Sequence, residues 1–177
     1  MGSGIKLKLY LIVQILSVIL LAGCKAAPDK SREEDIGRKI DTYMDQYKGG
    51  KAASDTLRIE TRLFPEAGAE GGEIARYTGA GDQVLRYRIT YYGETGKLVE
   101  NYYFIDDFIY YTSLLESYAS PISQEEAKTV SLVSAEGVII DGICYEYDSG
   151  GHTIGKNTIK ASYTNLQQLN DLFESQR

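Results

Sequence analysis

The amino-acid sequence predicts an α+β fold, in which a twisted antiparallel β-meander sheet is packed by an N-terminal and a C-terminal helix. Apolar residues recur about every four positions over residues 31–48 and about every two positions from residue 57 onward. Turns that contain glycine or aspartate separate these alternating segments, so consecutive strands are expected to be neighbours. We expect about six to eight strands, with both helices covering the apolar face of the sheet.

An apolar segment precedes this domain. Lys6 and Lys8 lie just before residues 9–21, an apolar run interrupted by few polar side chains. A positive start followed by a short apolar core is typical of a secretory signal peptide, whereas a membrane-spanning helix needs about 20 apolar residues. We therefore predict a signal peptide over residues 1–23.

The end of the apolar run carries a short motif, Leu21, Ala22, Gly23 and Cys24. It resembles the lipobox of bacterial lipoproteins, in which the cysteine becomes the lipid-modified first residue of the mature chain. The resemblance implies cleavage between Gly23 and Cys24, and attachment through fatty acyl chains such as palmitate to the extracytoplasmic face of the bacterial cell membrane. Each buried methylene contributes about 0.8 kcal/mol, so several chains hold a protein durably.

Two other assignments of Cys24 stay open: a free thiol in an uncleaved anchor, and a disulfide with Cys144, about 120 residues further on. Two distant cysteines, one beside a membrane leader, make a poor disulfide framework, which favours lipidation. Residues 24–30 contain Pro28 and no large apolar side chain, so we expect a flexible tether. Residues 31–177 then form a single α+β domain.

The chain is acidic. Its formal net charge is −6, and 17 basic against 25 acidic residues give −8 once the two lysines before residue 24 are removed. This charge argues against nucleic acid as a partner and against electrostatic adhesion to anionic lipid. One histidine and one unlipidated cysteine cannot supply a zinc site, and no glycine-rich phosphate-binding loop has the required flanks. We therefore expect neither a metal nor a cofactor.

The first expected element is a helix over residues 31–48. Ser31 and Glu34 match a capping box, and two glycines after residue 48 would end the helix. Its narrow apolar stripe, which favours packing on a sheet, consists of Ile36, Ile40 and Met44, widened by Tyr43 and Tyr47.

Three strands are expected next, separated by glycine-containing turns. Apolar and polar residues alternate in the segments TLRIETRLF, EIARYT and VLRYRITYY, as in strands with one face toward water. The strands span residues 57–63, 73–78 and 84–92.

Three two-residue turns predict how the following strands pair. The segment FIDDFIY recurs as IIDGICY, with an aspartate at the same place in both copies. A hairpin with two residues in its loop needs turn formers such as Asp, Asn and Gly at these positions. The turns are expected at Thr95 with Gly96, Asp106 with Asp107, and Asp141 with Gly142. The first turn would pair Tyr92 with Val99 and Tyr91 with Glu100. The second turn would pair Tyr103 with Tyr110.

The remaining elements are shorter. We expect a helical turn near residues 123–128, a strand at Val130–Val133 and a strand near residues 158–163. A closing helix follows, capped by Thr164 or Asn165. One face of this helix carries Leu166, Leu169, Leu172 and Phe173.

The sequence offers no convincing catalytic group. His152 lies in a glycine-rich loop beside Asp148 and Ser149, but members of a triad come from separate elements, so a turn with a solvated histidine is favoured. Cys144 occupies a strand position where a small buried residue is usual, which argues against a thiol paired with His152. Adjacent aspartates such as those at 106 and 107 point apart and commonly form turns.

A surface for a partner is expected on one face of the sheet. The alternation places Tyr87 and Tyr102 in the core, and another set of side chains on the opposite face. Tyrosine and arginine together suit a protein, peptide or glycan partner. The alternative is that this face binds nothing, because amphipathic tyrosines are stable on a half-exposed sheet face without any partner. The expected partner-binding residues are Arg86, Arg88, Tyr92, Tyr103 and Tyr110.

A tyrosine-rich meander behind a lipobox, with YYF shortly before an aspartate turn, also resembles small bacterial surface lipoproteins. This resemblance implies no activity. Two functions are expected from the residues: a non-catalytic, membrane-anchored binding or accessory module that uses the tyrosine and arginine face, or alternatively a surface hydrolase. The hydrolase would need two carboxylates within about 5–10 Å of each other.

Overall fold

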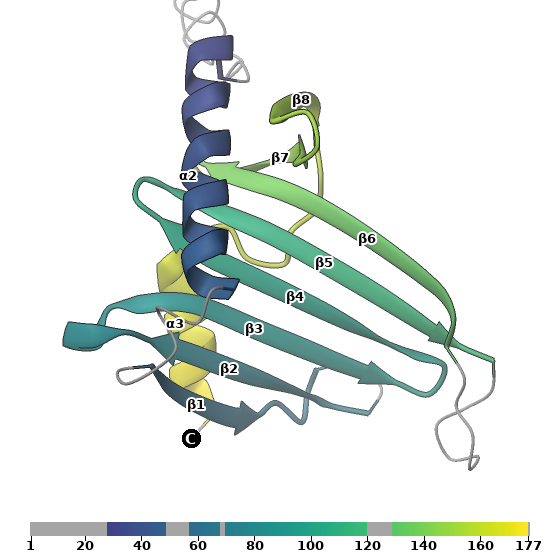
Figure 1. Ribbon diagram of the computed structural model, residues 1–177. Coiled ribbons are helices and arrows are strands. Elements are labelled where there is room, and N and C mark those ends of the chain that lie inside the picture. Colours follow the sequence, from purple (N-terminus) through teal and green to yellow (C-terminus); the bar gives the residue numbers. More distant parts are fainter. Residues whose placement is uncertain (1–27, 49–56, 68–69, 120–128, 177) are drawn as a thin grey trace, which may run out of the picture.

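A computed structural model describes residues 28–48, 57–67, 70–119 and 129–176 of the chain. Eight strands form one antiparallel sheet whose order follows the chain, and one helix lies on each face of the sheet (Figure 1). This confirms the predicted α+β fold with a meander sheet. Within the described ranges, no helix is long and apolar enough to cross a membrane.

Two-residue turns join β3 to β4, β4 to β5 and β6 to β7, as the glycine and aspartate residues predicted. The expected signal peptide, Cys24, most of the tether and the helical turn near residues 123–128 lie outside the described residues. In chain order the elements are α2 (Lys30–Lys48), β1 (Arg58–Leu63), β2 (Gly72–Thr78), the 3-10 helix η1 (Ala80–Asp82), β3 (Val84–Gly93), β4 (Gly96–Ile105), β5 (Phe108–Tyr118), β6 (Thr129–Ile140), β7 (Ile143–Asp148), β8 (Thr153–Thr158) and α3 (Leu166–Ser175).

The two helices cover opposite faces of the sheet, which corrects the expectation that both cover the same one (Figure 1). Successive side chains of a strand point to opposite faces, so neighbouring tyrosines in β4 and β5 place rings on both. Tyr102 and Tyr111 pack on the α3 side, whereas Tyr103 and Tyr110 pack on the α2 side. Each face is therefore apolar enough to need its own cover.

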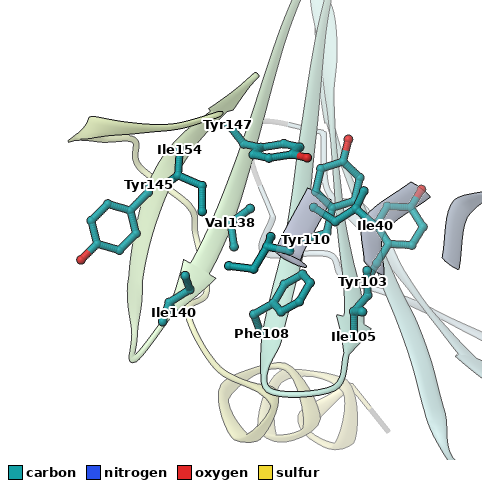
Figure 2. Packing of buried hydrophobic residues seen from close by; sticks show 11 residues of the cluster. Ile40, Tyr103, Ile105, Phe108, Tyr110, Val138, Ile140, Tyr145, Tyr147 and Ile154 are labelled. Atoms are coloured by element: carbon teal, nitrogen blue, oxygen red, sulfur yellow. The ribbon is translucent and has the colours of Figure 1, made fainter. Parts of the chain in front are cut away.

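Helix α2 packs through the predicted apolar stripe. Ile36 and Ile40 are each only 3% exposed and lie against the sheet, with Tyr43 and Met44 partly buried beside them. The buried residues of this α2-side core, most of them visible in Figure 2, are Ile36, Ile40, Tyr103, Ile105, Phe108, Tyr110, Val138, Ile140, Tyr145, Tyr147 and Ile154.

The start of α2 is capped two residues earlier than predicted. The Asp29 carboxylate accepts a hydrogen bond from the backbone N–H of Arg32 at 3.0 Å and another from the Ser31 hydroxyl at 2.7 Å. The Arg32 bond is the main cause that lowers the pKa of Asp29, with the Ser31 bond second. Ser31 thus supports the cap but does not form it, because the charged carboxylate of Asp29, two residues before it, is the acceptor.

The first long hairpin turns one residue earlier than predicted. Gly93 pairs with Gly96, and Tyr92 pairs with Lys97 and not with Val99. Gly96 is a strand residue here and not a turn residue. The position requires glycine, because a Cβ would overlap the backbone carbonyl oxygen of Glu116 on β5. The slip moves each partner by two positions, so every side chain stays on its expected face.

The other two hairpin predictions are confirmed. Tyr103 pairs with Tyr110 across the turn at residues 106–107, and Ile140 pairs with Ile143 across the turn at residues 141–142. Asp106, Asp141 and Gly142 have positive φ angles of 47°, 52° and 79°, as two-residue hairpin loops require.

The last strand differs from the prediction. Strand β8 spans Thr153–Thr158, and the expected strand near residues 158–163 is irregular except at its first residue. Ile159, Ala161 and Tyr163 nevertheless pack on the α3-side core, so their alternation reflects burial without strand pairing. Strand β6 contains the expected Val130–Val133 segment and continues to Ile140.

Helix α3 follows its prediction closely. Asn165 is the cap, and its side-chain oxygen accepts a hydrogen bond from the backbone N–H of Gln168 at 2.9 Å. Leu169 and Phe173 are fully buried among the α3-side residues. The guanidinium groups of Arg62 and Arg76 lie 3.8 and 4.2 Å from the centre of the Phe173 ring, a cation–π arrangement.

We predict that Tyr103→Ala lowers the free energy of unfolding by about 3 kcal/mol, because it removes a buried ring from beneath α2. Tyr92→Ala, at a half-exposed position of the neighbouring strand, should lower it by about 1 kcal/mol or less. Urea unfolding followed by circular dichroism measures both. Equal losses for the two variants would contradict the difference in burial between Tyr103 and Tyr92.

Candidate functional site

The predicted partner face is partly closed in the structure. Tyr103 and Tyr110 are only 7% and 5% exposed, because α2 packs over them. They belong to the core and cannot contact a partner, which corrects that part of the prediction. Arg86, Arg88 and Tyr92 lie on the same face and are half-buried.

Strand register arranges this face in rows that cross the sheet. One row lies beneath α2 and runs from Arg86 through Tyr103 and Tyr110 to Val138. The Arg86 guanidinium lies 4.4 Å from the ring centre of Tyr77 and 5.3 Å from that of Tyr103. Arg86 thus borders the α2-side core and holds its charge against aromatic rings.

The next row is polar. Arg88 pairs with Asn101, Asn101 pairs with Thr112, and Thr112 pairs with Glu136, so these four side chains cross strands β3 to β6 on the α2 side. We call these four residues the polar row. In its middle, the Asn101 side-chain N–H donates to the Thr112 hydroxyl oxygen at 3.1 Å. Strands β3 to β6 extend well beyond α2 here, leaving the rest of this face uncovered by the helix (Figure 1).

The ends of the polar row have unused hydrogen-bonding capacity. Among the described residues, the buried atoms Arg88 Nε and Glu136 Oε2 have no hydrogen-bond partner. The same holds for the hydroxyl of Thr90, which lies one row further from α2 and is 2% exposed. Most buried polar groups in proteins are hydrogen-bonded, so unpartnered ones that gather mainly on the α2 side make this face a candidate for a ligand surface.

Charge differs between the two ends of the polar row. Arg88 lies on β3 and Glu136 on β6, three strand spacings or about 14 Å apart. Glu136 also lies near Tyr110: burial, followed by the charge of Glu136, raises the pKa of this tyrosine. The row can therefore recognise an extended group that has an acceptor at one end and a donor at the other.

His152 does not lie free in solvent, which corrects the expectation for the glycine loop. Its Nε2 lies 3.4 Å from the Asp41 carboxylate of α2, and its Nδ1 lies 3.2 Å from the Tyr147 hydroxyl. Gly37 is needed for this approach, because a Cβ there would be 2.8 Å from His152 Nδ1. Burial, and then the nearby charge of Asp41, raises the pKa of Tyr147 to about 12.

The histidine therefore joins α2 to the β7–β8 hairpin. The nucleophilic constellation considered for the loop is not assembled, since Asp148 instead accepts a hydrogen bond from the Gly150 backbone N–H within the loop. Asp106 and Asp107 likewise act between elements: Asp106 lies 3.1 Å from Lys39, and Asp107 lies 3.5 Å from Arg32. These ion pairs bind the β4–β5 turn to α2.

A second cluster, missed from the sequence, lies on the α3 side. Glu100 is 2% exposed, and its carboxylate accepts hydrogen bonds from the hydroxyls of Tyr91, Tyr102 and Tyr111 at 3.3, 3.0 and 2.7 Å. Burial, and next the charge of Glu100, raises the pKa of each of these tyrosines. The signal was available, because the period of two places Glu100 on the same face as Tyr102.

Cys144 borders this cluster as a buried free thiol. Burial, and next the charge of Glu100, raises its pKa to about 12, so it is protonated and unreactive near neutral pH. The structure thus places Cys144 in the α3-side core, apart from His152 and the glycine loop. Over the described ranges, no group of three or more His, Cys, Asp or Glu side chains is placed to hold a metal ion.

Comparisons with protein-family models, curated proteins and solved structures found no match. The α3 side carries a satisfied, buried cluster, whereas the α2 side carries a half-exposed row with unpartnered polar atoms. The polar row is the better candidate for a site.

We predict that stability falls at alkaline pH. Cys144 and the tyrosines around Glu100 keep their protons to higher pH in the folded chain than in the unfolded chain, so folding binds protons. The contribution of Cys144 is complete below about pH 9 and is lost between pH 9 and 12, at up to about 1.4 kcal/mol per pH unit.

Urea midpoints measured from pH 7 to 11 test this prediction. Cys144→Ala should make the decline above pH 9 shallower by roughly the contribution of one group. An unchanged slope in this variant would show that the thiol ionises as easily in the folded chain as in the unfolded one.

Proposed function

We propose that this protein is a lipid-anchored, non-catalytic binding or accessory module on the extracytoplasmic face of a bacterial cell membrane. The observation that carries the binding role is the polar row, whose ends have buried atoms without hydrogen-bond partners among the described residues. The lipobox-like sequence at Leu21–Cys24 supports the anchor.

The chemistry of the polar row favours a protein or peptide partner that lies across the strands. Arg88 would donate to a carboxylate of this partner, and Glu136 would accept from an amine, hydroxyl or amide group. Asn101 and Thr112, between them, can donate to and accept from a backbone. Tyr92, half-buried beyond Arg88 on β3, supplies amphipathic contact area of the kind common in binding sites.

The anchor and the acidic surface are compatible. The chain after residue 23 has a net charge of −8, which gives it no electrostatic attraction to anionic lipid. Attachment would then depend on acyl chains, and the polar row would remain available to a partner near the membrane. A surface hydrolase is the alternative function, since Glu136 and Glu146 border one cavity beside β6 and β7.

The anchor predicts a specific labelling result. A cell that expresses the unaltered chain and is fed a labelled fatty acid should incorporate the label into this protein, whereas Cys24→Ala should incorporate none. Cys144→Ala, which removes the other thiol, is the matched control and should keep the label. Label retained by Cys24→Ala would rule out lipidation at this residue.

The partner site predicts selective loss of binding. With a photo-reactive amino acid at Thr112 in the full chain, cross-linking in the source membrane should give a discrete product. Arg88→Glu or Glu136→Lys should reduce the yield of this product at least tenfold, because each reverses the charge at one end of the row. The temperature of unfolding is measured on each variant, because both side chains are partly buried and a lower yield must be distinguished from unfolding.

Arg38→Glu is the matched control for this experiment. Arg38 is exposed on α2 and its guanidinium pairs with Asp35 at 3.0 Å, so its reversal alters the net charge equally without touching the polar row. An equal loss of product in Arg38→Glu would indicate a general charge effect, and an unchanged yield in Arg88→Glu would remove the polar row as the site. A product that is a glycan would contradict a protein or peptide partner.

A further inference from the structure

Strand β6 has a long free edge. It spans twelve residues, but β7 pairs only with its last four, from Gly137 to Ile140. No described strand pairs with the outer side of residues 129–136, which form the border of the sheet in Figure 1. Backbone N–H and C=O groups along such an edge are a template for another strand.

The free segment is apolar on both of its faces. Val130, Leu132 and Val133 are 60–62% exposed. Leu132 pairs with Glu116 and lies on the α2 side, whereas Val133 pairs with Leu115 and lies on the other side together with this exposed leucine. Solvent-exposed large apolar side chains on both faces of one edge indicate that the edge is covered in the assembled protein.

The other edges of the sheet have charged or short strands, whereas the free segment of β6 has only a register irregularity near Val130. Strand β1 carries the charged residues Arg58, Glu60 and Arg62, and β8 is only six residues long and contains Lys156. Charged side chains and short strands are the usual means of preventing edge pairing. Residues 129–135, TVSLVSA, contain no charge, no proline and no glycine.

We propose that residues 129–135 of β6 pair antiparallel with the same residues of a second copy of this chain, joining two sheets across a twofold axis. We centre the register on Leu132, which pairs with Leu132 of the other copy. This register keeps the α2 sides of both copies on the same face of the joined sheet and leaves no charged residue in the ladder. Val130 then pairs with Ser134, and Ser131 with Val133. The ladder has about six backbone hydrogen bonds, two for each hydrogen-bonded pair.

The neutral, apolar segment suits a second copy of itself as the occupant, although the net charge of the chain does not. The chain is acidic overall, so two copies repel over most of their surfaces. The neutral segment lets them meet without opposing like charges, and apolar side chains of each copy cover those of the other on both faces. Next to this segment, a cavity of about 320 Å³ lies beside β6 and β7 and leaves room for the end of the incoming strand; its border includes Ser134 and Ala135 and the carboxylates of Glu136, Glu146 and Asp148.

Disulfide cross-linking of the full chain tests the pairing and its register. In a hydrogen-bonded antiparallel pair the two Cα atoms are about 5.5 Å apart, within the range that a disulfide spans. Leu132→Cys should therefore form a covalent dimer as its main product under mild oxidation. Val133→Cys is equally exposed, but its two copies would be displaced along the strands by about 7 Å and should cross-link at least tenfold less.

Ile59→Cys, exposed on β1, is the control for random collision, and the unaltered chain gives the background from Cys24 and Cys144. Equal cross-linking at residues 59 and 132 would overturn the proposal, and preferential cross-linking at residue 133 would overturn the register. These experiments do not use the polar row, so their outcome is independent of the proposed binding function.

Sedimentation velocity of the full chain in detergent gives a second measurement. The unaltered chain should sediment as a dimer, and Leu132→Lys should halve its mass while leaving the unfolding temperature nearly unchanged, because the residue is exposed in the single chain. A monomer for the unaltered chain at tens of micromolar would overturn the proposal and assign the edge to a strand of a different protein.

Discussion

The fold depends on large side chains that fill both faces of the central strands. In β4 and β5 the consecutive pairs Tyr102–Tyr103 and Tyr110–Tyr111 direct one ring to each side, and all four are almost fully buried. Neither face can be left to solvent, so one amphipathic helix must cover each. The burial of Tyr103 and Tyr110 follows from this constraint, and so does the boundary between the covered part of the α2 side and the polar row beside it.

The α3 side pairs this packing with a buried charge. A carboxylate removed from water is costly unless hydrogen bonds replace its hydration, and three tyrosine hydroxyls do so for Glu100. These donors come from β3, β4 and β5, so the carboxylate fixes the relative positions of three strands. The Tyr163 backbone N–H also donates to the Tyr102 hydroxyl at 3.3 Å, which connects the segment before α3 to the same cluster. An arrangement of this kind specifies one register, because a slip would leave the charge unpartnered.

Much of the fold follows from sequence because meanders are built from local signals. The turns at Asp106 and Asp141 and the helix after Asn165 depend on residues close in the chain. Where a glycine or histidine serves a distant contact, local reasoning fails: Gly96 makes room for a carbonyl of β5, and His152 contacts α2. The polar row needed an accurate register over four strands before its members could be recognised as neighbours. The segment near residues 158–163, expected to be a strand, shows that alternate side chains can be buried without hydrogen bonding to a neighbouring strand.

The position of α2 has a mechanical consequence. It is the first described element of the chain, and it is fixed to the sheet along its length by contacts from Arg32 to Asp107, from Lys39 to Asp106 and from the Tyr43 hydroxyl to the Leu85 carbonyl. With the proposed anchor at Cys24, the residues before Asp29 would reach at most about 18 Å from the membrane. Force on a bound partner would then pass from the sheet through these contacts into α2 and along its axis to the lipid. The force that the protein withstands would depend on the force needed to separate α2 from the sheet. This force is distinct from the equilibrium stability of the domain.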